Sequence, residues 1–346
     1  MIDFRYHLVS IIAIFFALAA GIALGAGPLK AGVDQTLTDQ TSALRDENQQ
    51  LRDQIATLES TAEYRDAFVG AVTPELIDGR LADRRVVLVA LPGADADQVA
   101  AIGETLAGSG AAVGATVSID PTWTDAGSAA VLDTLASELV SSGTTLPEGD
   151  GYDRGATVLA GALLEPADDA PGEGDTGAVP EPGPTEEAAA PEAGPTQEPT
   201  PGAEEEDAES SATTLAAFGE AGLVSVEGEP TPEADLAVVV AGTPFDDEEL
   251  ERRNAALVTL ATALDAAGSG TVLAGPPSSA GETGVVAALR ADGNAAELVS
   301  TVDVASLPSG RVAVVYALEE QVAGGSGHYG AVGTTDGPLP TGDQEQ

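Results

Sequence analysis

An apolar stretch near the N-terminus constrains this chain more than any other feature. From Leu8 to Gly27 the sequence reads LVSIIAIFFALAAGIALGAG, which is 20 residues without a charged side chain. As a helix, this segment is about 30 Å long and matches the hydrocarbon core of a bilayer. The stretch therefore predicts a single transmembrane helix over residues 8–27.

A cleaved signal peptide is the alternative interpretation, because Ala23-Leu24-Gly25 offers small residues at a cleavage site. Signal peptides have a shorter apolar core and a more basic region before it. The apolar stretch here is longer, and the basic region is thin. We therefore expect an anchor that stays attached.

The charges that flank the apolar stretch predict its orientation. Arg5 and the N-terminal amine favour a cytoplasmic position for residues 1–7, whereas Asp3 offsets them and Lys30 competes from the other side. The balance favours a single-pass protein of the cell membrane, with its N-terminus inside and its bulk outside the cytoplasm.

Small residues recur every four positions within the apolar stretch. They are Ala13, Ala17, Gly21 and Gly25. A stripe of this kind lets two transmembrane helices approach closely, so it predicts a packing face. A general richness in alanine and glycine is the alternative explanation.

A heptad repeat follows over residues 31–70. Its leucines lie seven residues apart, and Asn48 and Ile55 fall at the second apolar position of the repeat. The predicted stalk residues are Leu37, Leu44, Asn48, Leu51, Ile55 and Leu58. Asparagine at such a position favours a two-stranded register, so the repeat predicts a coiled coil in a parallel homodimer. A lone amphipathic helix that packs on its own domain is the alternative.

The rest of the chain alternates apolar runs with helical patterns. Strands are expected at 86–91, 112–119, 236–241, 271–274 and 311–318, and helices at 95–106, 123–141, 246–264 and 283–291, with 157–163 as strand or helix. This alternation predicts an α/β domain with a Rossmann-like, mainly parallel sheet, formed by residues 80–165 and 213–332. Residues 166–212 are proline-rich and acidic, so they predict a disordered insert, and residues 333–346 a disordered tail.

The composition excludes several classes of function. The formal net charge is −44, which repels the phosphates of nucleic acids. There is no cysteine, and there are only two histidines (His7 and His328) and one methionine, so a site for a soft metal has few ligands to draw on. No nucleophile-elbow, zinc-protease or phosphate-loop motif is present. We expect no enzyme activity and no cofactor, and the sequence leaves any metal ligands unknown.

Two regions of the sequence are candidate binding sites. The turns Pro92-Gly93 and Gly242-Thr243-Pro244 follow predicted strands, where α/β sheets bind ligands, but the acidic residues after them disfavour a nucleotide. The second is a candidate docking loop formed by Gly324, Gly325, Ser326, Gly327, His328, Tyr329 and Gly330. A structural turn or a docking surface suits this loop better than a phosphate cradle, because no helix pattern follows it.

Several segments together resemble the MctB family of copper transport outer-membrane proteins. They are MIDFRYHLVSI and GIALGAGPL at the N-terminus, VLVALPGAD at 87–95, STVD at 300–303 and GRVAVVYALEEQVAGGSGHYG at 310–330. The resemblance covers the anchor, the stalk and both halves of the α/β domain, but not the acidic insert. It implies a role in copper efflux or homeostasis, as a channel or transport component. Copper is the one bound metal that the resemblance implies.

The resemblance also implies an alternative role. Similar proteins are proposed to act as single-pass coiled-coil scaffolds in cell division, with a cytoplasmic membrane protein as partner and a peptidoglycan hydrolase that they help to activate. The sequence itself disfavours a pore in an outer membrane, because such pores are closed β-barrels of alternating polar and apolar residues. These predicted strands are instead continuous apolar runs between helices.

Overall fold

The computed structural model describes residues 4–26, 28–140, 145–165, 203–228, 234–246 and 248–340. The side chains of residues 26, 28–39 and 203–209 are outside this description. The chain divides into two compact units, Met1–Ala67 and Phe68–Gln346. Each unit is described by itself below.

The first unit is helical. Helix α1 is Phe4–Ala26, and helix α2 is Pro28–Ile77, which begins in this unit. Proline suits the first position of a helix, because its missing N–H has no intrahelical partner there. Among the described residues, α1 is the one helix long and apolar enough to cross a membrane, and the side chains of residues 4–25 are exposed. The predicted apolar helix is therefore present.

The second unit contains a seven-stranded sheet of order β3-β2-β1-β4-β5-β6-β7. The strands are β1 Arg85–Ala90, β2 Ala112–Ile119, β3 Val224–Glu227, β4 Leu236–Val240, β5 Thr271–Ala274, β6 Ser300–Val302 and β7 His328–Tyr329. All neighbouring strands pair in parallel except β2 and β3, which are antiparallel. The mainly parallel α/β sheet predicted from the sequence is therefore confirmed.

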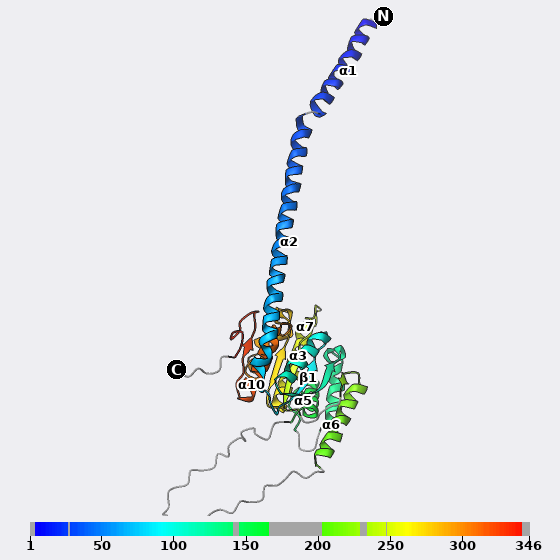
Figure 1. Ribbon diagram of the computed structural model, residues 1–346. Coiled ribbons are helices and arrows are strands. Elements are labelled where there is room, and N and C mark those ends of the chain that lie inside the picture. The colour runs from blue at the N-terminus through cyan, green and yellow to red at the C-terminus, as the bar shows by residue number, and fades with distance from the viewer. Residues whose placement is uncertain are drawn as a thin grey trace, which may run out of the picture. The chain divides into compact units, whose positions relative to one another are not determined.

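Helices cover both faces of the sheet (Figure 1). The α-helices of this unit are α3 Ala96–Gly108, α4 Ser128–Leu139, α5 Gly151–Leu163, α6 Ala203–Glu220, α7 Leu250–Ala267, α8 Val285–Ala291, α9 Gly293–Leu298 and α10 Pro308–Val322. Two short 3-10 helices are Pro121–Thr124 and Pro277–Ala280. Helices α3 and α10 pack on one face with the end of α2, and α4 to α9 contribute to the core on the other.

The central strands show why both faces must be covered. In β1, Val86 and Leu88 point into the core formed with α3 and α10, whereas Val87 and Val89 point into the core on the other face. Successive side chains of a strand point to opposite faces, so a continuous apolar run is stable only between two layers of helices. The apolar runs of β1 and β4 therefore specify a sheet buried on both sides.

One predicted strand is wrong. Residues 311–318 form the middle of helix α10, which begins with Pro308 at its first position. The run VAVVYAL resembles a buried strand because most of these side chains are buried in the helix as well. Apolar periodicity cannot separate a buried strand from a helix buried nearly all round.

Other boundaries differ from those expected. Residues 157–163, for which the pattern predicts a strand or a helix, belong to α5, and the helix expected at 123–141 is a 3-10 turn followed by α4. Residues 166–202 of the predicted insert lie outside the described residues, and residues 203–212 belong to α6 instead. In α6, Leu215 and Phe218 are buried, so this helix is part of the fold.

Candidate functional site

The glycine-rich loop at residues 324–330 is an integral part of the sheet. His328 and Tyr329 form β7, which pairs with Thr301 and Val302 of β6. A side chain at Gly327 would clash with the Tyr329 hydroxyl, and one at Gly330, whose φ is 141°, would clash with the Asp303 carboxylate. The glycines therefore permit close packing of this segment on the domain.

Residues 333–340 also contact this strand, although a disordered tail was predicted for them. The backbone N–H of Asp336 donates to the His328 carbonyl at 2.7 Å, and that of Gly330 donates to the Gly337 carbonyl at 3.0 Å. The Asp336 carboxylate in turn accepts from the His328 backbone N–H at 2.8 Å. The segment thus returns to the edge of the sheet and fixes β7 there.

A buried ion pair holds the same segment from the inside. The Asp303 side chain is 0% exposed and that of Arg290 10%, and Arg290 Nη1 lies 3.0 Å from Asp303 Oδ2. Asp303 also accepts from the backbone N–H groups of Ala331 (2.7 Å) and Val332 (3.2 Å). These bonds compensate for the desolvation of the carboxylate. Sequence reasoning singled out STVD at 300–303 only as a resemblance and missed this pair.

His328 is a poor candidate for chemistry. Its Nδ1 lies 3.1 Å from the Thr301 hydroxyl, and Arg290 Nε also donates to that hydroxyl at 2.8 Å. Burial lowers the pKa of His328, the Arg290 charge lowers it further, and Asp336 opposes them. These contacts favour a neutral His328 imidazole with a structural role.

Tyr329 is fixed in the same way. Its hydroxyl donates to Glu320 Oε2 at 2.6 Å. Burial raises the pKa of Tyr329, and the hydrogen bond to Glu320 and the charge of that carboxylate act in the same direction. The Ser326 hydroxyl donates to the Glu297 carbonyl at 2.8 Å, so all three polar side chains of the loop predicted as a docking surface are engaged within the domain.

The crevice at the carboxyl ends of β1 and β4 is closed. The backbone N–H of Thr243 donates to the Gly93 carbonyl at 3.3 Å, and a side chain at Gly242 would lie 2.0 Å from the Pro92 carbonyl oxygen. The cavity left beside these turns is about 10 Å³. Since one water needs about that space, the described residues of these two turns leave no room for a nucleotide between them.

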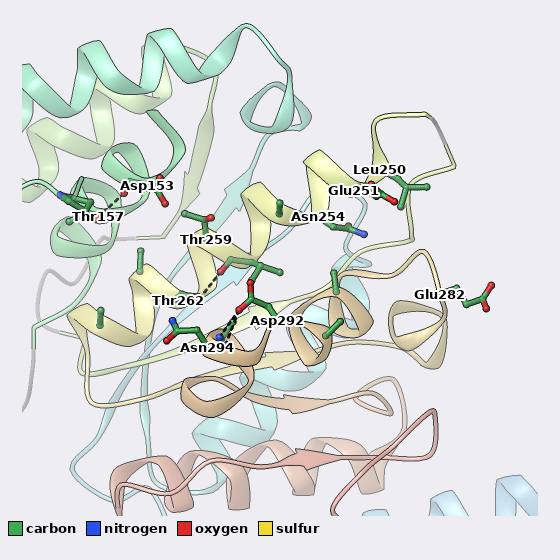
Figure 2. Close-up of a pocket in the computed structure, with 18 residues that line it drawn as sticks. Asp153, Thr157, Leu250, Glu251, Asn254, Thr259, Thr262, Glu282, Asp292 and Asn294 are labelled. Carbon is green, nitrogen blue, oxygen red and sulfur yellow. Dashed lines mark hydrogen bonds between the residues drawn. The ribbon is translucent and has the colours of Figure 1, made fainter. Parts of the chain in front are cut away.

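A groove of about 680 Å³ lies on the helical face that contains α7 (Figure 2). Its floor is α7, from Leu250 to Ala266. Residues from α5 (Asp153, Thr157) and the segment α8–α9 (Asp292, Asn294) also line it, as Figure 2 shows. Sequence reasoning missed this groove, because α5 lies about 100 residues before α7 and α8–α9 and meets them only in the folded domain.

The groove is acidic. Four of its lining residues are carboxylates, namely Asp153, Glu251, Glu282 and Asp292, and none of the lining residues is Lys or Arg. Asp292 caps α9 by accepting from two backbone N–H groups, and Asp153 belongs to the capping box of α5. Glu251 and Glu282 are exposed at the surface. The groove is therefore suited to a cationic ligand rather than to a phosphate.

Metal-binding residues do not cluster in the described ranges. Within these ranges, no group of three or more His, Asp or Glu side chains is arranged to hold a metal ion, and the chain has no Cys. Copper prefers sulfur and imidazole ligands, and these are nearly missing from the sequence. Neither the groove nor the loop offers such a set.

The remaining candidate residues lie in the helical first unit. Ala13, Ala17, Gly21 and Gly25 are exposed on α1, and a side chain at Gly21 or Gly25 would meet no atom within 4 Å. On α2, the stalk residues Leu44, Asn48, Leu51, Ile55 and Leu58 are all exposed. Leu37 lies on α2 as well, but its side chain is not among those described.

Comparison with known proteins identifies the relatives of this chain. Residues 1–340 match the model of a family described as copper transport outer membrane protein, MctB. The copper transporter MctB of Mycobacterium tuberculosis (strain ATCC 25618 / H37Rv) is 30% identical over 335 residues, which cover 95% of this chain and 96% of the relative. The copper transporter MctB of Mycobacterium leprae (strain TN) is 27% identical over 350 residues, with the same coverage.

Proposed function

The chain belongs to the MctB family, and on this premise we propose that it acts at a membrane of the cell envelope in copper homeostasis. The observation that carries this proposal is the family match over residues 1–340, which includes the apolar helix α1 and the α/β domain. The relatives named as copper transporters are matched over nearly their whole length. The copper role is therefore proposed for the whole chain.

The proposed topology is a single-pass protein with residues 1–7 in the cytoplasm and the α/β domain outside it. Support comes from the 22-residue span Phe4–Gly25, which is long enough to cross a bilayer. Arg5 lies at the N-terminal end of this span, ahead of the charge-free stretch that begins at Leu8, and positive residues favour the cytoplasmic side. We propose that α1 is retained as an anchor.

We further propose that the chain acts as a dimeric, non-enzymatic scaffold and does not conduct copper by itself. One transmembrane helix encloses no pore, and the residue types that bind copper selectively are almost lacking. The proposed dimer is a parallel coiled coil through the exposed stripe of α2. Leu51 and Ile55, each about half exposed, are apolar side chains that a second copy of the helix would bury.

The second candidate function is a role in cell-wall remodelling. In this proposal the dimer presents its α/β domains to a peptidoglycan hydrolase. Each domain has a Rossmann-like, mainly parallel sheet. A cytoplasmic membrane protein would be the partner on the other side. The exposed apolar side chains of α2 support this candidate, because a parallel dimer that serves as a scaffold would bury them.

Deletion of the gene separates the two candidates. The copper proposal expects the deletion strain to accumulate copper and to lose copper tolerance, with both restored by the wild-type gene. The cell-wall proposal expects that the deletion strain separates late after division at normal copper content. A gene that carries L44Q/L51Q should then fail to restore normal separation, whereas the wild-type gene should restore it. Unchanged copper content and tolerance in the deletion strain would refute the copper role, and normal separation would refute the scaffold role.

A further inference from the structure

We propose that the groove along α7 is a docking site for a cationic helix of another protein. Its floor presents Ala255, Thr259, Thr262 and Ala266 at spacings of four, three and four residues. Ala255 and Ala266 are exposed, and Thr259 and Thr262 are half-buried. This spacing places the four small side chains on one face of α7, so the backbone of a second helix can approach closely.

The dimensions of the groove suit a helix. From Glu251 to Ala266 the floor is about 22 Å long, given a rise of about 1.5 Å per residue, which equals about four helical turns. α5 residues form part of one wall, and α8–α9 residues form part of another (Figure 2). The volume of about 680 Å³ accepts a row of side chains from the guest, while the rest of the guest helix stays above the surface.

Charge decides which kind of helix fits. Asp153, Glu251, Glu282 and Asp292 line the groove without any compensating Lys or Arg among its lining residues. Asp153 and Asp292 already accept backbone hydrogen bonds. An acidic or neutral guest would, however, desolvate Glu251 and Glu282 without bringing them a positive charge, at a cost in binding free energy. A guest helix with Lys or Arg on both sides of an apolar ridge would pair with them.

Neither the rest of this chain nor a second copy supplies such a helix. Residues 166–202 contain nine acidic residues, no Lys or Arg, and many prolines, which are unsuited to a helix. Helix α2, which has more basic residues than the other helices, carries nine acidic residues against four basic ones. The guest must therefore come from a different protein, and this holds whether or not the copper role is correct.

A designed peptide tests the proposal. The probe is a fluorescein-labelled helical peptide of about 18 residues, with leucines at spacings of four and three and lysines flanking them. A peptide of the same composition in scrambled order serves as control for charge alone. Fluorescence anisotropy with the full chain in detergent is expected to give about tenfold tighter binding of the ordered peptide, since only it matches the groove in shape.

Paired variants locate the binding site. Ala255→Trp fills the floor, and E251Q/E282Q removes two carboxylates, so each should weaken binding of the ordered peptide at least about tenfold. Ala100→Trp on α3 and E104Q/E138Q on α3 and α4 make the same changes at exposed positions outside the groove and should leave the affinity within about twofold. Circular dichroism confirms that each variant is folded. Equal binding of the scrambled peptide, no binding of the ordered one, or full affinity in the groove variants would overturn the proposal.

Discussion

At the scale of single residues, Asp303 carries the strongest test of the fold. Its carboxylate is completely buried against Arg290 and two backbone N–H groups. Asp303→Asn leaves the Arg290 charge buried without a counter-charge, so we expect it to lower the free energy of unfolding by about 3–5 kcal/mol. Denaturant unfolding of the full chain in detergent, followed by circular dichroism, measures this loss.

The matched control is Asp133→Asn, which breaks the ion pair with Arg154. The side chains of this pair are 46% and 35% exposed, and their atoms approach to 2.6 Å. Exposed pairs contribute about 0–1 kcal/mol, because water and salt screen them. If the two substitutions destabilised the protein equally, the buried pair would have no special role in holding the C-terminal segment.

The carboxylate of Asp265 makes the free energy of unfolding depend on pH. Burial raises the pKa of Asp265 to about 6, and a backbone hydrogen bond from Thr271 opposes this shift. Since the folded protein then binds the proton more tightly than the unfolded chain, the ionised carboxylate costs stability as pH rises from about 4 to about 6. Asp265→Asn should therefore stabilise the protein by about 1–2 kcal/mol at pH 7.5 and by little at pH 4.

Comparison at the two pH values isolates this effect. The many other carboxylates titrate in wild type and variant alike, so their contribution cancels in the difference between the two. Ala266→Ser, an exposed change beside Asp265 on the same helix that adds no ionisable group, should give the same small difference at both pH values. A stabilisation by Asp265→Asn that does not change between pH 4 and pH 7.5 would show that ionisation of Asp265 is not its cause.

At the scale of elements, α2 yields the prediction about assembly. Leu44 and Leu51 are 60% and 51% exposed. In the proposed coiled coil each would be buried, and burial of a leucine contributes about 1.5–3 kcal/mol. L44Q/L51Q should therefore weaken the dimer at least about a hundredfold and give monomers in sedimentation of the full chain in detergent.

Tyr64 provides the control for this prediction. It is 71% exposed on the same helix but falls outside the apolar positions of the repeat. Tyr64→Gln removes an exposed apolar side chain as well and should leave the mass unchanged. A wild-type monomer, or a dimer that survives L44Q/L51Q, would contradict the coiled coil, and the apolar stripe would then need another partner.

The elements also show what the sequence can and cannot predict. The strands at 86–91, 236–241 and 271–274 were predicted correctly, because short apolar runs bounded by turn residues leave few other interpretations. The run at 311–318 has the same composition but forms α10, and Pro308 was the available signal of a helix start. Local patterns specify elements well only where turns bound them closely.

The candidate sites depend on contacts that local patterns do not contain. The groove combines α5 with α7, about 100 residues later in the sequence, and the Arg290–Asp303 pair joins a helix to a strand end. The sequence shows the glycines at 327 and 330 but not why they are required, because the Tyr329 hydroxyl and the Asp303 carboxylate approach them only in the folded sheet. The sequence shows that the whole chain is acidic, but it does not show which carboxylates line the groove.

At the scale of the whole molecule, the last prediction concerns copper itself. Selective copper sites use thiolate, thioether or imidazole ligands, whereas this chain has no Cys, one Met and two His. One of the two is His328, whose Nδ1 contacts the Thr301 hydroxyl. The purified full chain should therefore bind less than one copper ion per chain in competition with a micromolar chelator, and His328→Ala should not change this value.

Absence of a tight copper site would make membership of the copper transport family compatible with the proposed scaffold role. A protein that affects cell copper without holding the ion must act through what it recruits or through the envelope it helps to build. The acidic surface can collect cations weakly, but carboxylates favour hard ions such as Mg²⁺ and Ca²⁺, so excess Mg²⁺ should displace any copper retained there. One tightly bound copper per chain that survives both the chelator and Mg²⁺ would instead favour direct transport.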